Sequence, residues 1–166
     1  LNTAVTVALF HSNGTGAYAQ GDTYANIQNV IGSAGSDLFY AGTVANNFDG
    51  GSAGNDTVSY RYSTSGPIVA SLATGVGGTV GDANGDKYIS IENLTGSENV
   101  NSTLTGDTAN NILTALGLAN NTTNYLDGGD GNDTLNGVDG AHNTLIGGIG
   151  NDNFIVGASG TSLGNN

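Results

Sequence analysis

The segment LDGGDGNDTLNG, Leu126 to Gly137, carries the pattern that decides the fold, and GGIGNDNFIVG, Gly147 to Gly157, repeats it. Both contain the unit G-G-x-G-x-D-x-U-x, in which U is a large apolar residue. Glycine tolerates positive φ angles, so the backbone can curl tightly and direct its carbonyl groups inward. The aspartate, Asp133 or Asp152, adds a carboxylate to those carbonyls. The sequence therefore predicts tight turns that are lined by oxygen atoms.

Two earlier copies of the unit have serine in place of the second glycine. They are GSAGSDLFY, Gly32–Tyr40, with Asp37, and GSAGNDTVS, Gly51–Ser59, with Asp56. In each half of the chain the two aspartates stand 19 residues apart. A degenerate turn lies between them, with Asn46 in the first half and Asn143 in the second. Aspartate is therefore expected on every second turn.

Large apolar residues recur at intervals of mostly nine or ten residues within each half of the chain. This spacing fits neither an amphipathic helix nor an ordinary hairpin meander. It predicts a coil with one short strand and one turn per step, in which each strand stacks its apolar anchor on the next. The anchors are Val30, Phe39, Phe48, Val58, Leu94, Leu104, Leu113, Leu126, Leu135, Leu145 and Phe154.

A longer repeat lies over the short one. GDTYANIQNVIGS at 21–33 aligns with GDKYISIENLTGS at 85–97, and AVTVALF at 4–10 and PIVASLA at 67–73 both read as strands. We therefore expect two related units in one all-β chain. These are 1–60, with turns at 32–59, and 61–157, with turns at 96–155, followed by a flexible tail at 158–166.

The composition limits the partners. The 166 residues carry 14 acidic and 2 basic side chains, a net charge of −12. This charge argues against nucleic acid and anionic membranes as partners and suits cations. There is no cysteine, which excludes disulfides and thiolate metal sites, and no apolar run approaches the roughly 20 residues of a membrane span. We expect no membrane insertion.

Carbonyl and carboxylate oxygens together suit a hard cation, and Ca²⁺ is the cation we expect. The pattern resembles the RTX (repeats in toxin) family of calcium-binding proteins, most specifically in GGDGNDTLNG and GGIGNDNFIVG. The resemblance implies a right-handed parallel β-roll or β-helix, in which turns alternate between two sides and each calcium lies between a turn and the next but one. It also implies a secreted, extracellular or cell-surface protein, exported in one step by Gram-negative bacteria.

The candidate calcium ligands follow from this geometry. We expect one row of calcium in each unit, on the side of its paired aspartates, and weak binding on the opposite side, because asparagine supplies only a neutral oxygen. Ser102 and Asn111 also stand where aspartate belongs, which indicates turns without calcium. The candidates are Gly32, Ala34, Asp37, Gly51, Ala53, Asp56, Gly128, Asp130, Asp133, Gly147, Ile149 and Asp152.

Calcium is expected to decide whether the chain folds. Clustered carboxylates repel one another by roughly 1 kcal/mol per close pair in water. A bound ligand at 100 times its dissociation constant stabilises the folded state by about 2.7 kcal/mol per site. We therefore expect a loose or disordered calcium-free state and a folded calcium-bound state, with folding delayed until after export.

A second acidic loop is a weaker candidate for a metal site. Asp82, Asn84 and Asp86 occupy the first, third and fifth places of an EF-hand-like loop, but Lys87 replaces its glycine and Asn93 its last acid. A solvated polar turn is the favoured interpretation. A lone cation at Asp86 and its counterpart Asp22 remains an alternative.

No motif predicts an enzyme. Neither histidine, His11 or His142, lies in a zinc-binding context, and GTSLG at 160–164 is followed by two residues rather than by the helix that a nucleophile elbow needs. We expect a structural role in a surface layer, filament or adhesin, with calcium as partner and possible self-association through open strand edges. The alternatives are a carrier module of a larger exported toxin or hydrolase, and a face that binds ice or cell-surface polysaccharide.

Overall fold

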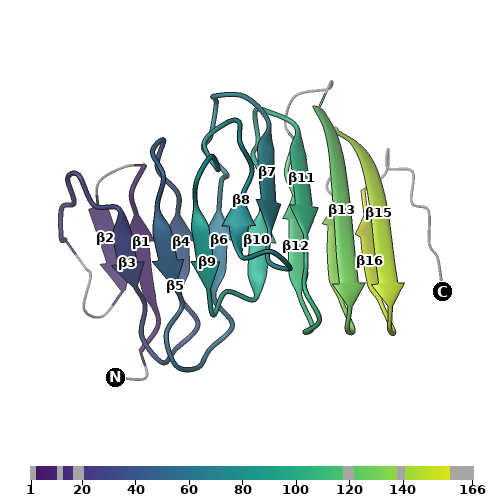
Figure 1. Ribbon diagram of the computed structural model, residues 1–166, viewed down its shortest axis with the longest axis horizontal. Helices are drawn as coiled ribbons and strands as arrows, with labels where there is room; N and C mark the ends of the chain where they lie inside the picture. The colour runs from purple at the N-terminus through teal and green to yellow at the C-terminus, as the bar shows by residue number, and fades with distance from the viewer. Residues whose placement is uncertain (1–2, 11–12, 17–20, 118–121, 138–140, 158–166) are drawn as a thin grey trace.

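The structure is a computed structural model, and it describes residues 3–10, 13–16, 21–117, 122–137 and 141–157. Within these ranges the chain is all-β, with no helix, and its strands form two sheets of eight strands. The sheets lie face to face, and the strands stack along the long axis, from β1 to β3 near one end to β15 and β16 near the other (Figure 1). The expectation of an all-β chain is confirmed. The described part of the chain holds no helix long and apolar enough to cross a membrane.

The first sheet, sheet A, runs in the order β16-β14-β12-β10-β6-β4-β1-β2. Sheet B runs in the order β15-β13-β11-β7-β8-β9-β5-β3. Sheet A contains β1 (Val5–Ala8), β2 (Asn13–Gly16), β4 (Leu38–Tyr40), β6 (Thr57–Ser59), β10 (Asn93–Thr95), β12 (Ile112–Ala115), β14 (Thr134–Gly137) and β16 (Asn153–Val156). Sheet B contains β3 (Asn29–Ile31), β5 (Asn47–Asp49), β7 (Ile68–Ser71), β8 (Val76–Gly77), β9 (Lys87–Ile89), β11 (Ser102–Thr105), β13 (Thr122–Asp130) and β15 (Ala141–Ile149).

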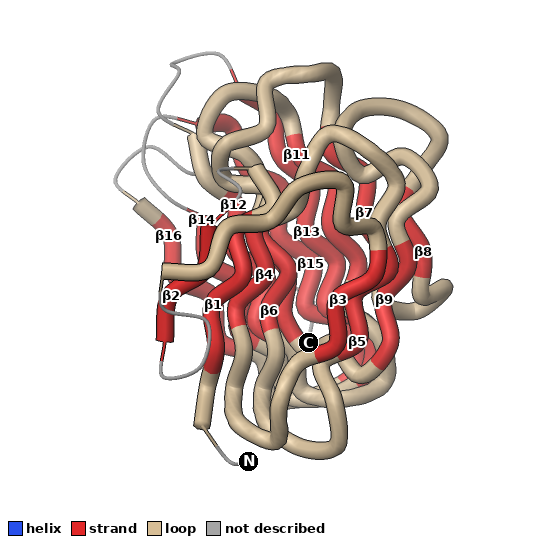
Figure 2. Tube along the Cα trace, turned by 90° about the vertical axis from the view of Figure 1, so that its left-hand side faces the viewer, coloured by secondary structure: helices blue, strands red, loops and turns tan. Residues whose placement is uncertain are grey.

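Successive strands alternate between the sheets over β3 to β6 and over β10 to β16. Strands two apart in sequence are therefore parallel, hydrogen-bonded neighbours. Figure 2 looks along this stack, with β1, β4 and β6 on one side and β3, β5 and β9 on the other. The antiparallel pairs are β1 with β2, β7 with β8, and β8 with β9. The two sheets are thus mostly parallel and are not closed into a barrel.

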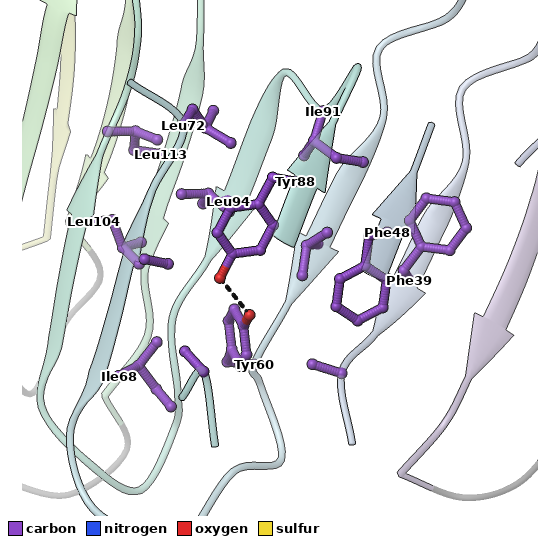
Figure 3. Close-up of a cluster of buried hydrophobic side chains, with 14 of the residues drawn as sticks. Phe39, Phe48, Tyr60, Ile68, Leu72, Tyr88, Ile91, Leu94, Leu104 and Leu113 are labelled. Atoms are coloured by element: carbon purple, nitrogen blue, oxygen red, sulfur yellow. Dashed lines mark hydrogen bonds between the residues drawn. The ribbon is translucent and has the colours of Figure 1, made fainter. Parts of the chain in front are cut away.

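The apolar anchors form the core, as the sequence predicts. In each three-residue strand the middle side chain is buried, because alternate strand residues face opposite sides. The flanking side chains are more exposed, except for Ser59 and Asn93. Phe39, Val58, Leu94, Leu113 and Leu135 stack on successive strands of sheet A. Figure 3 shows part of this core, including the stacked rings of Phe39 and Phe48, whose centroids lie 5.8 Å apart. All eleven predicted anchors are buried except Phe154, which is half-buried against the same core.

The segment between the two predicted units interrupts only one of the sheets. In sheet A, β6 pairs directly with β10, so that Val58 faces Leu94 although 36 residues separate them in sequence. In sheet B, β7, β8 and β9 fill the corresponding space with two antiparallel pairings. The units 1–60 and 61–157 therefore share both sheets.

Candidate metal site

The residue two positions before each anchor lies at one of the two edges of the stack, where a turn leads into a strand. We call the row that precedes the anchors of sheet A the carboxylate edge, and the row that precedes those of sheet B the amide edge. The turns of the carboxylate edge, such as those from β11 to β12 and from β13 to β14, lie at the bottom of Figure 1. The carboxylate edge consists of Asp37, Asp56, Glu92, Asn111, Asp133 and Asp152. The amide edge consists of Gln28, Asn46, Asp86, Ser102, Asn124 and Asn143, in which Asp86 precedes Tyr88, the buried middle residue of β9.

Side-chain oxygens of the carboxylate edge link neighbouring rows of that edge. Each acid accepts a hydrogen bond from a main-chain N–H of the preceding strand or turn on the same edge. A charged acceptor makes such bonds stronger than a neutral one does. The bonds run from Val5 N to Asp37 Oδ1 (2.7 Å), Asp37 N to Asp56 Oδ1 (2.7 Å), Asp56 N to Glu92 Oε2 (2.7 Å), Asn111 N to Asp133 Oδ1 (2.8 Å) and Asp133 N to Asp152 Oδ1 (3.0 Å).

The structure brings the predicted ligands together in two pairs of turns. The turn of Gly51, Ala53 and Asp56 lies on that of Gly32, Ala34 and Asp37, and the turn of Gly147, Ile149 and Asp152 lies on that of Gly128, Asp130 and Asp133. The two pairs do not meet, because Glu92 and Asn111 lie between them along the edge.

Glycine allows the close approach within these pairs. Gly51 (φ 107°) and Gly148 (φ 99°) adopt backbone angles that favour glycine. A side chain at either position would collide with a carbonyl oxygen of the turn below, that of Ser33 or of Gly129. Main-chain carbonyls therefore reach the space between paired turns, as expected for an oxygen-lined site.

Sequence reasoning missed two residues of this region, Gly50 in the turn before Asp56 and Glu92 in the carboxylate edge. Gly50, not Gly51, packs against the carboxylate of Asp56 as Gly32 packs against that of Asp37, because this turn is one residue longer. Glu92 takes the aspartate position before Leu94, and Ser90, at φ 49°, directs its carbonyl towards Gly50. Counting back two residues from the anchor Leu94 would have found Glu92.

Asp133 is the least satisfied carboxylate of the edge. Its side chain is 1% exposed, and Oδ1 accepts the Asn111 N–H. Oδ2 is buried and has no hydrogen-bond partner among the residues that the structure describes. Burial raises the pKa of Asp133, and the charges of Asp152, Asp107 and Asp127 raise it further, while the bond from Asn111 lowers it. An unpaired buried carboxylate is costly unless a cation or a donor meets it.

Asp56 and Asp37 also differ in how many protein donors form hydrogen bonds with their carboxylates. Burial raises the pKa of Asp56 to about 6; the hydrogen bond from Asp37 opposes this shift, and the charges of Glu92, Asp37 and Asp49 add to it. Asp37 instead has three protein donors, Val5 N at 2.7 Å, Ser33 N at 2.5 Å and Ser33 Oγ at 3.1 Å. The Ser33 hydroxyl, which has no counterpart at Gly129, therefore supplies one hydrogen bond that Asp133 lacks.

Asparagine side chains at equivalent positions form their hydrogen bonds without a cation. On the carboxylate edge, Asn111 Oδ1 accepts Asp107 N–H (2.8 Å), while its Nδ2 donates to the Glu92 carbonyl (2.9 Å). On the amide edge, Asn124 Oδ1 accepts Ser102 N–H (2.8 Å), and its Nδ2 donates to Asn143 Oδ1 (3.0 Å). An amide both donates and accepts, whereas a carboxylate only accepts.

Asp86 is the one carboxylate of the amide edge. It is fully buried and accepts Asn46 N–H (2.7 Å) at Oδ1 and the Tyr60 hydroxyl at Oδ2. Tyr60 and Tyr88 hydroxyls lie 2.6 Å apart (Figure 3). Burial raises the pKa of Asp86 to about 6, against the lowering by the bonds from Tyr60 and Asn46. Asp82 is buried nearby, Asn84 is exposed, and Asp22 is an exposed residue of the segment before β3.

In the described part of the chain, no three His, Cys, Asp or Glu side chains group closely enough to hold a metal by themselves. The candidate site is thus one of carboxylates with main-chain carbonyls. His142 is exposed, while His11 and the segments 158–166 and 160–164 lie outside the described residues. Neither protein-family models nor curated proteins give a match to this chain.

We expect the calcium-free protein to be more stable at pH 5 than at pH 7.5. Asp56 and Asp86 have pKa values of about 6 in the fold, above the ordinary 3.8. Because the folded state binds these protons more tightly, the stability they contribute is complete below about pH 4 and is lost as the pH rises through 6. Asp86, which is fully buried, contributes about 1–3 kcal/mol. Asp56 contributes less, because solvent screening weakens its shift. Urea unfolding in chelator across this range measures the effect.

The matched variant Asp56→Asn should flatten part of this pH dependence, because its amide does not titrate. A calcium-free stability that stays level or increases between pH 5 and pH 7.5 would contradict the prediction.

Proposed function

We propose that this chain is a calcium-binding structural module of a secreted or cell-surface protein, folded as a right-handed parallel β-roll. Right-handed crossovers are the general rule for parallel strands, and the alternation of strands between two sheets fits such a coil. The observation that carries the proposal is Asp133 Oδ2, buried and without a hydrogen-bond partner in the described chain. A divalent cation would neutralise it and the nearby charge of Asp152.

The donor set suits calcium. Carboxylate oxygens of Asp133 and Asp152 and carbonyl oxygens of the two turns are hard ligands, and calcium takes six to eight of them in flexible geometry. Gly128, Asp130, Gly147 and Ile149 are the main-chain candidates. Ile149 O already accepts the Gly131 N–H at 2.8 Å, so it would serve with its second lone pair. The bound ion supplies positive charge that holds two turns together.

The role that follows is mechanical. Extracellular modules bind calcium at about 0.1–1 mM, so the carboxylate edge would be completed after export. A stiff, acidic coil with strands stacked along one axis suits a surface layer, filament or adhesin. No catalytic step is proposed.

Calorimetric titration of the chelator-treated protein with CaCl₂ tests the proposal. We expect Asp133→Asn to weaken calcium binding by about tenfold or more, because it removes one of the charged ligands. The control Glu98→Gln changes a carboxylate that pairs with Arg61 away from the carboxylate edge, and it should bind calcium as the wild type does. Absence of calcium binding, or equal affinity in both variants, would remove the proposal.

Sedimentation velocity with and without calcium tests the assembly role. Larger species that form only with calcium are expected. A monomer under both conditions would exclude assembly by this chain alone and would favour the carrier module.

A further inference from the structure

The two edges of the stack differ in how their hydrogen bonds are completed. Resting on the proposed function, we infer that removal of calcium opens the carboxylate edge alone, while the amide edge stays closed and acts as a hinge. The calcium-free protein would then be a half-open coil, in contrast to the loose or disordered calcium-free state that the sequence predicts. The inference rests on one contrast: most side chains of the amide edge both donate and accept hydrogen bonds, whereas the carboxylates at equivalent positions of the other edge only accept them.

The amide edge draws its donors from the chain itself. Ser102 N–H donates to Asn124, whose own amide donates to Asn143, so that three successive turns are linked without an ion. Asn124 Nδ2 also lies 3.3 Å from the Leu116 carbonyl oxygen, as a second acceptor. Ladders of side-chain amides of this kind stabilise stacked parallel strands.

A tyrosine meets the one carboxylate on this edge. Tyr60 follows β6 in sheet A, and its hydroxyl donates to Asp86, which precedes β9 in sheet B. The bond links the two sheets inside the core, next to Tyr88 (Figure 3). The hydroxyl supplies a neutral donor at the second carboxylate oxygen, the place where Asp133 has none.

The carboxylate edge has no such donor at its weakest point. Around Asp133 the side-chain acceptors that cross this edge are carboxylates, those of Asp133 and Asp152. The charges of Asp152, Asp107 and Asp127 lie close to Asp133. Without a cation, these charges repel one another across a poorly hydrated turn. The turns at 128–133 and 147–152 are therefore expected to separate first.

Amide hydrogen exchange followed by NMR tests the inference on the whole chain in calcium and in chelator. The two edges offer amides of the same kind, each donating to a side-chain oxygen of the neighbouring turn on the same edge. On the carboxylate edge, Asp37, Asn111 and Asp133 should lose protection at least tenfold in chelator. On the amide edge, Asn46 and Ser102 should change less than threefold.

Two isosteric substitutions exchange the chemistry of the edges. Asp133→Asn introduces a donor and should reduce the effect of chelator on its turn. Asn124→Asp removes the donor to Asn143 and should make the Ser102 amide lose protection in chelator. If Asn124→Asp does not fold, amide hydrogen exchange of the wild-type protein in calcium and in chelator still tests the inference.

Equal loss of protection at both edges in a protein that binds calcium would overturn the inference and leave the proposed function intact. Exchange that does not respond to calcium at either edge would overturn both.

Discussion

Chelation of calcium should lower the free energy of unfolding by about 5 kcal/mol, which corresponds to a fall in melting temperature of roughly 10–20 °C for a chain of this size. The estimate assumes two occupied sites, one for each pair of aspartate turns, at calcium 100 times its dissociation constant. The physical reason is the unpaired carboxylate of Asp133 and the acidic neighbours around it. Thermal unfolding followed by circular dichroism, in calcium and in chelator, measures the change.

Magnesium serves as the control cation, because it demands near-ideal octahedral geometry and gives up its water reluctantly. It should restore little of the lost stability. If the half-open coil is right, the far-ultraviolet spectrum in chelator keeps part of its β signal at low temperature. A melting curve and a spectrum that are the same in calcium and in chelator would contradict the prediction.

Leu113→Ala should lower the free energy of unfolding by about 2–5 kcal/mol. Leu113 is fully buried in sheet A between Leu94 and Leu135, so truncation leaves a cavity inside a stack that cannot easily collapse. The neighbouring residue on the same strand, Ile112, is 49% exposed and faces outward. Ile112→Ala is therefore the matched control, and urea unfolding in saturating calcium gives both values.

The comparison tests the register of the strand directly. A shift by one residue would bring Ile112 inward and Leu113 outward. Equal losses in the two variants, or a larger loss in Ile112→Ala, would show that the strand does not have the register described.

Much of the fold could be predicted because its repeat is local. Within one step, the positions of Asp133 and Leu135 already determine which residue enters the turn and which enters the core. The spacing of nine or ten residues then stacks the anchors on strands two apart, as it does for Leu94 and Leu113. The spacing of aspartates by two turns likewise predicts their meeting on one edge, where Asp133 N–H bonds to Asp152.

The remainder depends on contacts across long stretches of sequence. Glu92 joins the carboxylate edge only because β6 pairs with β10 across the insert. The bond from Tyr60 to Asp86 also needs β7 to β9 in place, and no local pattern predicts a tyrosine there. The repeat pattern indicates only that Asn111 stands where aspartate belongs, whereas in the folded chain its amide donates a hydrogen bond to the Glu92 carbonyl.

The most direct test of the account is a crystal structure of the protein grown in calcium, with anomalous diffraction used to locate the ion. We expect a calcium ion between the turn of Gly128 to Asp133 and that of Gly147 to Asp152, with Asp133 among its ligands. Well-ordered turns at this position with no ion between them would contradict the account.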